Sequence, residues 1–88
     1  MPYKYKIHSK MSYNSNMDRI NNKFAIRLKE LREEKKISQQ KLAIELGYTQ
    51  ACIGKWEAGT REPKLDDAIA VALFFSVTTD YLLGLTDL

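Results

Sequence analysis

The chain of 88 residues has few of the side chains that disulfides, metal sites and nucleophilic active sites need. Cys52 is its only cysteine, so no disulfide can form within the chain. His8 is its only histidine, which is too few for a Ser-His-Asp triad or a histidine-rich metal site. No constellation of acid, base and nucleophile is visible. The sequence therefore predicts a protein that is not an enzyme and that holds no metal and no cofactor.

Long apolar segments are absent as well. No run approaches the ~20 apolar residues that a membrane-spanning helix needs. The first residues, MPYKYKIHSKMSYNSN, lack the apolar centre of a secretory signal peptide. Without an export signal or a disulfide, we expect a cytoplasmic protein that has no membrane partner.

The positive charge is concentrated at the start of the chain. The net charge is +3, and residues 1–22 carry four basic side chains against one acidic, whereas residues 23–88 carry ten of each. The polar composition predicts a flexible basic tail over residues 1–21. Ser15 and Asp18 also have the spacing of a helix start, so the first helix has a second candidate origin upstream of Asn22.

From Asn22 onward the apolar residues follow a helical period. Phe24, Leu28 and Leu31 recur at spacings of four and three, which places them on one face of a helix. A fourth helix is predicted from residue 65 or 66 to about residue 75, and a short fifth one follows a threonine at 78 or 79. We predict an all-α fold, a compact five-helix bundle over residues 22–84 with a short C-terminal tail at 85–88.

The second and third predicted helices are joined by a very short link. Ser38 can cap a helix over residues 39–46 and Thr49 one over residues 50–58, since each hydroxyl can bind free backbone N–H groups. Gly47 and Tyr48 form the whole link, which keeps the two helices in contact at a sharp crossing. This is the helix-turn-helix arrangement, in which the second helix enters the DNA major groove.

Four motifs extend this interpretation to a family. They are L-x-x-L-R from residue 28, S-Q-x-x-L-A-x-x-L-G from 38, T-Q-x-x-I-x-x-W-E-x-G from 49 and V-x-x-D-Y-L-L-G from 77. Through them, residues 23–84 resemble the bacterial helix-turn-helix family of the phage repressor and Cro proteins, also called the xenobiotic-response-element family. The resemblance implies a lambda-repressor-like fold of five helices, sequence-specific operator binding, and usually binding as a two-fold dimer.

The start of the third helix holds the predicted base contacts. Gln50 is its first residue, and a glutamine there can make two hydrogen bonds to adenine. The methyl group of Ala51 can meet a thymine methyl, and Lys55, further along the same face, can reach guanine or a phosphate. Each of the three residues also has an interpretation without a DNA contact. Gln50 would then be an exposed polar residue, Ala51 a small helix former and Lys55 a solvated lysine.

The predicted phosphate contacts surround this helix. Side chains and N–H groups at helix starts can bind phosphates, which positions a protein without reading sequence. Capping or solvation alone is the alternative for each residue, and the prediction depends on their convergence. Three of them depart from the usual family pattern by adding a donor: Lys41, Tyr48 and Lys64. The full set is Gln39, Lys41, Tyr48, Thr49, Thr60, Arg61 and Lys64.

Two further features concern the third helix itself. The resemblance implies a partly buried salt bridge between Arg32 and Glu57, and it makes Trp56 a core residue rather than a base-stacking one. Gly54 lies inside the helix, where glycine costs roughly 1 kcal/mol relative to alanine. It either permits close approach to DNA or is a tolerated weak position.

We therefore expect a transcriptional regulator, most readily a repressor, that binds a palindromic operator as a homodimer and is nucleoid-associated when bound. The chain is either a stand-alone Cro-like protein or the DNA-binding half of a longer regulator. An alternative of another class is a protein-interaction module, such as an antitoxin or an antagonist of a homologous regulator, with DNA binding secondary. Its apolar interface would use Phe74, Leu83, Leu85 and Leu88.

Overall fold

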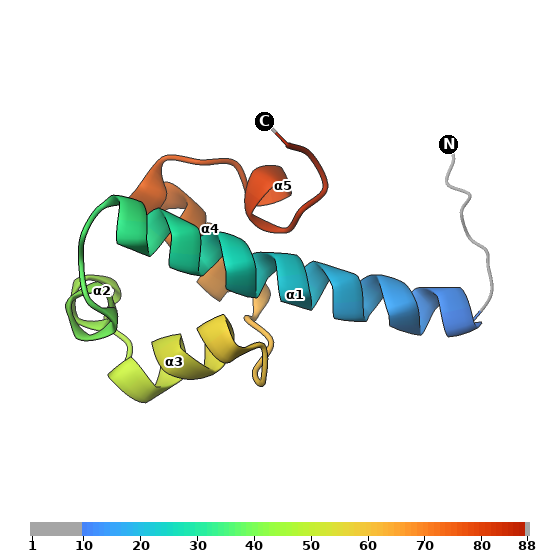
Figure 1. The fold of residues 1–88 in the computed structure, drawn as a ribbon, viewed down its shortest axis with the longest axis horizontal. Coiled ribbons are helices and arrows are strands. Elements are labelled where there is room, and N and C mark those ends of the chain that lie inside the picture. Colours follow the sequence, from blue (N-terminus) through green and yellow to red (C-terminus); the bar gives the residue numbers. More distant parts are fainter. Residues whose placement is uncertain (1–9, 88) are drawn as a thin grey trace.

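The computed structural model describes residues 10–87, and the side chains of residues 22–87 (Figure 1). The described residues form five helices and no strand, which confirms the predicted all-α fold. None of these helices is both long enough and apolar enough to cross a membrane. In chain order they are α1 (Lys10–Glu34), α2 (Gln39–Leu46), α3 (Gln50–Ala58), α4 (Leu65–Phe75) and α5 (Thr79–Leu82).

The first helix starts earlier than either predicted origin. α1 begins at Lys10, upstream of both Ser15 and Asn22, and its N-terminal part projects beyond the other helices (Figure 1). No proline or glycine stands between Lys10 and Asn22, so nothing in this stretch interrupts the helix. The tail predicted over residues 1–21 therefore overlaps α1 from Lys10 onward, and residues 1–9 lie outside the described part.

The core lies where α1 and the helix-turn-helix pair meet α4 and α5. Trp56 is 1% exposed, and the rings of Phe24 and Tyr48 approach its ring edge-on, with centroids 5.8 and 5.0 Å away. Such aromatic pairs contribute about 0.5–1.5 kcal/mol beyond the area that they bury. The prediction that Trp56 is a core residue is confirmed. The rest of the central cluster is Leu28, Leu42, Ala43, Ile53, Val71, Ala72, Phe75 and Leu82.

The helix ends are set by the residues that the sequence indicated. The hydroxyls of Ser38 and Thr49 accept hydrogen bonds from the third backbone N–H of α2 and α3, at 3.0 and 3.1 Å. Gly47 and Gly59 end these helices with φ of 80° and 77°, a conformation that glycine adopts without strain. These local signals fix where the helix-turn-helix pair begins and ends.

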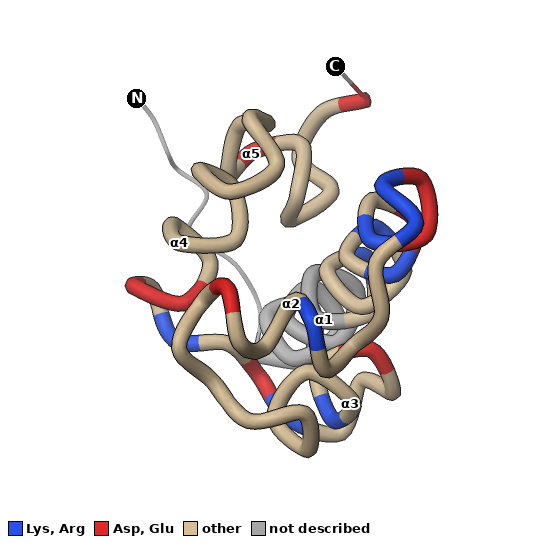
Figure 2. The backbone as a smooth tube through the Cα atoms, turned by 90° about the vertical axis from the view of Figure 1, so that its left-hand side faces the viewer, with Lys and Arg blue, Asp and Glu red and all other residues tan. Residues whose placement is uncertain are grey.

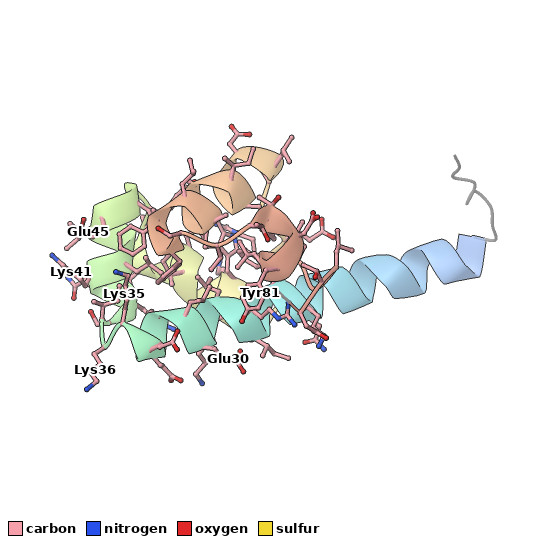
Figure 3. The ribbon with its side chains drawn as sticks, turned by 90° about the horizontal axis from the view of Figure 1, so that it is seen from above. Glu30, Lys35, Lys36, Lys41, Glu45 and Tyr81 are labelled. Carbon is pink, nitrogen blue, oxygen red and sulfur yellow. The ribbon has the colours of Figure 1, made fainter. Side chains whose placement is uncertain are left out.

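One buried charge, not anticipated from the sequence, attaches the C-terminal segment to α1. The guanidinium of Arg27 donates to the carbonyl oxygens of Tyr81 and Thr86 and to the carboxylate of Asp87. It also lies 4.2 Å from the centroid of the Tyr81 ring, which is labelled beside α1 in Figure 3. The segment predicted as a short tail after residue 84 is thus held against α1 as far as Asp87.

Gly84 lies close to the same helix. Its φ is +80°, and a Cβ at this position would stand 2.6 Å from the Cβ and Cγ of Lys23. A side chain here would therefore meet both an unfavourable backbone conformation and a steric clash.

We expect Gly84→Ala to destabilise the fold by about 1–3 kcal/mol, because it adds a clash to the cost of a left-handed backbone. Urea unfolding measures this loss. Gly47→Ala is the matched control, since its φ is also +80° but a Cβ added there would have no neighbour within 4 Å. Equal losses in the two variants would show that the contact with Lys23 does not matter.

Candidate nucleic-acid interface

The predicted base-contacting residues share the solvent side of α3. Gln50, Ala51 and Lys55 are all exposed, whereas Ile53 and Trp56 point into the core. In Figure 1, α3 forms the lower edge of the bundle, so its outer face is uncovered by the other helices. The structure thus places the three residues together, as a helix that can enter a major groove about 12 Å wide requires.

A buried ionic network fixes the inner side of α3, the side opposite its exposed face. The Arg32 Nε donates to Glu57 Oε2 at 2.6 Å and the Nη2 to Oε1 at 3.1 Å, so the ion pair implied by the resemblance is present and bidentate. The two side chains are only 12% and 5% exposed. The Arg32 Nη1 also donates to the Ile37 carbonyl oxygen at 2.8 Å. Hydrogen bonding to Glu57 raises the pKa of Arg32, against the opposing effect of burial.

Gln39 is part of this network. Its Nε2 donates to Glu57 Oε1 at 3.1 Å, which links the first residue of α2 to the end of α3. Its Oε1 lies 3.6 Å from the position of a Cβ on Gly54, an ordinary van der Waals distance. Gln39 thus has a structural partner in addition to its predicted phosphate contact. A Cβ at position 54 would therefore fit beside Gln39 without a clash.

Tyr48 connects the helix-turn-helix link to α4. Its hydroxyl donates to Asp67 Oδ1 at 2.6 Å, while Asp67 Oδ2 accepts from the backbone N–H of Lys64 at 2.9 Å. The hydrogen bond to Asp67 is the main reason why the pKa of Tyr48 is raised to about 12, and burial adds to it. A phosphate would compete with Asp67 for this hydroxyl. The side chain of Lys64, the residue just before α4, does not cap the helix, and Asp67 supplies the cap instead.

The remaining predicted phosphate contacts are exposed. The Thr49 hydroxyl accepts from the Cys52 N–H and keeps its own hydrogen to donate, so capping and phosphate binding are compatible. Lys41 pairs with Glu45 at 2.9 Å on the outer side of α2 (Figure 3). Thr60 donates to the Lys55 carbonyl oxygen at 3.3 Å. Arg61 and Lys64 lie on the loop between α3 and α4, and Figure 2 shows basic positions around α2, α3 and this loop.

The sequence interpretation missed two residues that shape this region. Asp67 stands three residues after Lys64, a spacing at which a carboxylate can cap a helix start. That spacing could have indicated the cap, but not the second bond to Tyr48. Arg27 lies between Phe24 and Leu31 on the buried face of α1, and a basic residue on such a face is a signal for a buried partner.

Comparison with known proteins gives the family. The sequence model of the helix-turn-helix family matches residues 28–82. The chain belongs to this family. Similar curated proteins include the HTH-type transcriptional regulator YobD of Bacillus subtilis, 38% identical over 61 residues, which are 69% of this chain and 54% of YobD. The SPbeta prophage-derived regulator YonR of Bacillus subtilis is 42% identical over 60 residues, 68% and 56% of the two chains.

A third similar protein is the HTH-type transcriptional activator BcrR of Enterococcus faecalis, 38% identical over 61 residues, 69% of this chain and 30% of BcrR. The chain thus spans about half the length of YobD and YonR and less of BcrR. An activator therefore stands among the relatives of this chain.

Two solved structures resemble this one over nearly their whole length. The P22 c2 repressor in complex with a synthetic operator has a TM-score of 0.65 at 28% identity, covering 68% of this chain and 91% of that one. The restriction-modification controller protein C.AhdI of Aeromonas hydrophila has a TM-score of 0.65 at 32% identity, covering 70% and 94%. The helix-turn-helix family of this chain is therefore of the phage repressor and Cro type, whose members regulate transcription by binding DNA.

We expect Arg32→Ala to lower the free energy of unfolding by about 3–5 kcal/mol, because it leaves the buried Glu57 carboxylate without its partner. Thermal or urea unfolding measures this. Lys41→Ala is the matched control, since it breaks an exposed ion pair and should change stability by less than about 1 kcal/mol. Unchanged stability of Arg32→Ala would contradict a structural role for the pair.

The Tyr48–Asp67 bond predicts a pH dependence at the alkaline end. The folded protein holds the Tyr48 proton more tightly than the unfolded chain, since the pKa is raised from 10.0 to about 12. The resulting stability is present below pH 10 and is lost as the pH rises through about 12. We expect Tyr48→Phe to be less stable than the wild type at neutral pH, with the difference narrowing between pH 10 and 12. Urea unfolding at a series of pH values checks this, and a constant difference would count against the bond.

Proposed function

We propose that this protein is a repressor that binds a palindromic operator as a homodimer and prevents transcription by occupying promoter DNA. The observation that carries the proposal is the exposed face of α3, where Gln50, Ala51 and Lys55 point outward from a helix fixed on its inner side by Arg32 and Glu57. The likeness to the P22 c2 repressor, solved with an operator, supports it. The proposal places the protein in the cytoplasm, on the nucleoid when bound.

In the proposed complex the start of α3 reads the bases. Gln50 makes two hydrogen bonds to an adenine, Ala51 meets a thymine methyl, and Lys55 reaches a guanine or a phosphate. Side chains at the starts of α2 and α3 and on the following loop contact phosphates on either side of the groove. These are Gln39, Lys41, Tyr48, Thr49, Thr60, Arg61 and Lys64.

A two-fold dimer would set the spacing of the operator. Recognition helices of a symmetric helix-turn-helix dimer enter successive major grooves on one side of the DNA, so the half-sites lie about 34 Å apart. Symmetry of the protein predicts symmetry of the site. A palindrome with half-sites one helical turn apart is therefore the expected operator.

The apolar residues expected to form the interface of the protein-interaction alternative differ in their exposure. Phe74 and Leu83 are half-buried against the core, Leu85 is 62% exposed, and Leu88 lies outside the described residues. Besides Leu85, the large apolar side chains that are exposed include three on α4, which are Leu65, Ile69 and Leu73. An antitoxin or antagonist would use such a surface and would bind DNA only secondarily, whereas the proposed repressor function uses the outward face of α3 directly.

We expect Gln50→Ala to change the DNA sequence that the protein selects. Sites are selected from random DNA with the wild type and with the variant. The variant should lose preference at one base pair of each half-site, at a cost of about 1–3 kcal/mol. Gln40→Ala is the matched control, because Gln40 is an exposed glutamine on α2 outside the predicted contacts.

Recovery of the same motif from the wild type and Gln50→Ala would reject Gln50 as a base reader. A motif without two-fold symmetry would reject the proposed dimeric complex. Failure to select any motif would reject operator binding and favour the protein-interaction alternative.

A further inference from the structure

An apolar stripe runs along the outer face of α4. Leu65, Ile69 and Leu73 are spaced by four residues, so they lie on one side of the helix. They are 74%, 42% and 74% exposed, whereas Val71 and Phe75 on the inner side are buried. Three large apolar side chains in a continuous exposed row differ from the scattered single ones that occur on most protein surfaces, and they indicate an interaction site.

The flank beside this stripe carries opposite charges at its two ends. Asp66 is exposed in the first turn of α4. At the other end, the Lys35 ammonium lies 5.7 Å from the centroid of the Phe74 ring. Figure 3 shows Lys35 on the side of α1 toward α2 and α4, whereas Lys36 points away from the bundle. Between these ends the flank presents Ala70, which is small.

This arrangement is self-complementary under a two-fold axis. If two copies of α4 pack antiparallel about Ile69, Leu65 meets the partner's Leu73 and Ile69 meets the partner's Ile69. Antiparallel helices bring the same flank of each helix together. Asp66 then lies on the same flank of the dimer as the partner's Lys35. Each dimer would gain two such charge pairs.

We propose that the Leu65–Ile69–Leu73 stripe is the homodimer interface, with a second copy of this chain packed antiparallel on α4 and with Asp66 paired to the partner's Lys35. The inference rests on the proposed function in that it supplies the contact surface of the proposed operator-binding dimer. It is compatible with DNA binding, because α3 forms the lower edge of the molecule in Figures 1 and 2 and α4 lies above it.

The first test measures the dimer dissociation constant of the full chain by sedimentation equilibrium. Leu73→Glu should weaken the dimer by about a hundredfold or more, because symmetry places two carboxylates in an apolar contact. Ile44→Glu is the matched control, since Ile44 is 67% exposed on α2, and its dissociation constant should stay within about twofold. Circular dichroism and thermal unfolding confirm that both variants fold.

The second test concerns the register. Asp66→Lys and Lys35→Glu should each weaken the dimer by about tenfold, because each turns two attractive contacts into repulsive ones. The double variant should return to within about threefold of the wild type. Failure of the double variant to recover overturns the antiparallel arrangement. A wild type that is monomeric at millimolar concentration, or a Leu73→Glu dimer as tight as the wild type, overturns the interface and leaves the stripe to another partner.

The two proposals can fail separately. Binding of Leu73→Glu to a DNA duplex with a single half-site reports on α3 alone and should match that of the wild type at the same salt concentration. If the sedimentation results hold but no DNA motif is selected, the proposed function fails and the interface stands. If DNA is selected as a palindrome while Leu73→Glu dimerises normally, the interface is wrong and the function stands.

Discussion

The bidentate ion pair between Arg32 and Glu57 is the interaction on which the DNA-facing surface depends. Burying two charges is costly, and the cost is offset here only because each oxygen and nitrogen finds a partner. The Ile37 carbonyl takes one guanidinium N–H and the Gln39 amide supplies a further donor to Glu57. The network therefore joins the end of α1, the start of α2 and the end of α3. These three points fix the direction of α3 relative to its supporting helices.

Because the ionic network fixes α3 on its inner side, the two faces of this helix have different roles. Ile53, Trp56 and Glu57 face inward and contribute to the free energy of folding, whereas Gln50 and Lys55 face solvent. Surface substitutions away from buried partners usually change stability by less than about 0.5 kcal/mol. The outward residues of such a helix can therefore change between related regulators, and with them the preferred operator, without loss of the fold. Gly54 lies between the two faces, and its neighbour Gln39 does not require a glycine there.

Much of the fold could be predicted because its signals are local. The hydroxyls of Ser38 and Thr49 and the period of Phe24 and Leu28 report on neighbours within a turn or two. The Arg32–Glu57 pair was predictable only through the family resemblance, since its partners are 25 residues apart. The bonds of Arg27 to the C-terminal segment span 54 to 60 residues, and no spacing rule reaches that far.

The candidate site was likewise predictable only where its features depend on residues that are close in the sequence. The outward position of Gln50, Ala51 and Lys55 follows from helical period, so the sequence sufficed for it. The hydrogen-bond partners of the predicted phosphate contacts depend on how α4 packs against the helix-turn-helix link, as the Tyr48–Asp67 bond shows. Gln39, Lys41 and Tyr48 are already engaged by acidic groups, so a phosphate would compete with a carboxylate at three of the seven predicted contacts of each subunit. Residues 23–88 add no net charge to compensate. In the proposed complex, strong binding therefore depends on joining two half-site contacts, since the second then binds at a high effective concentration. On this argument, strong operator binding requires both the Leu65–Ile69–Leu73 stripe on α4, which joins the two subunits, and the exposed face of α3, which contacts the bases.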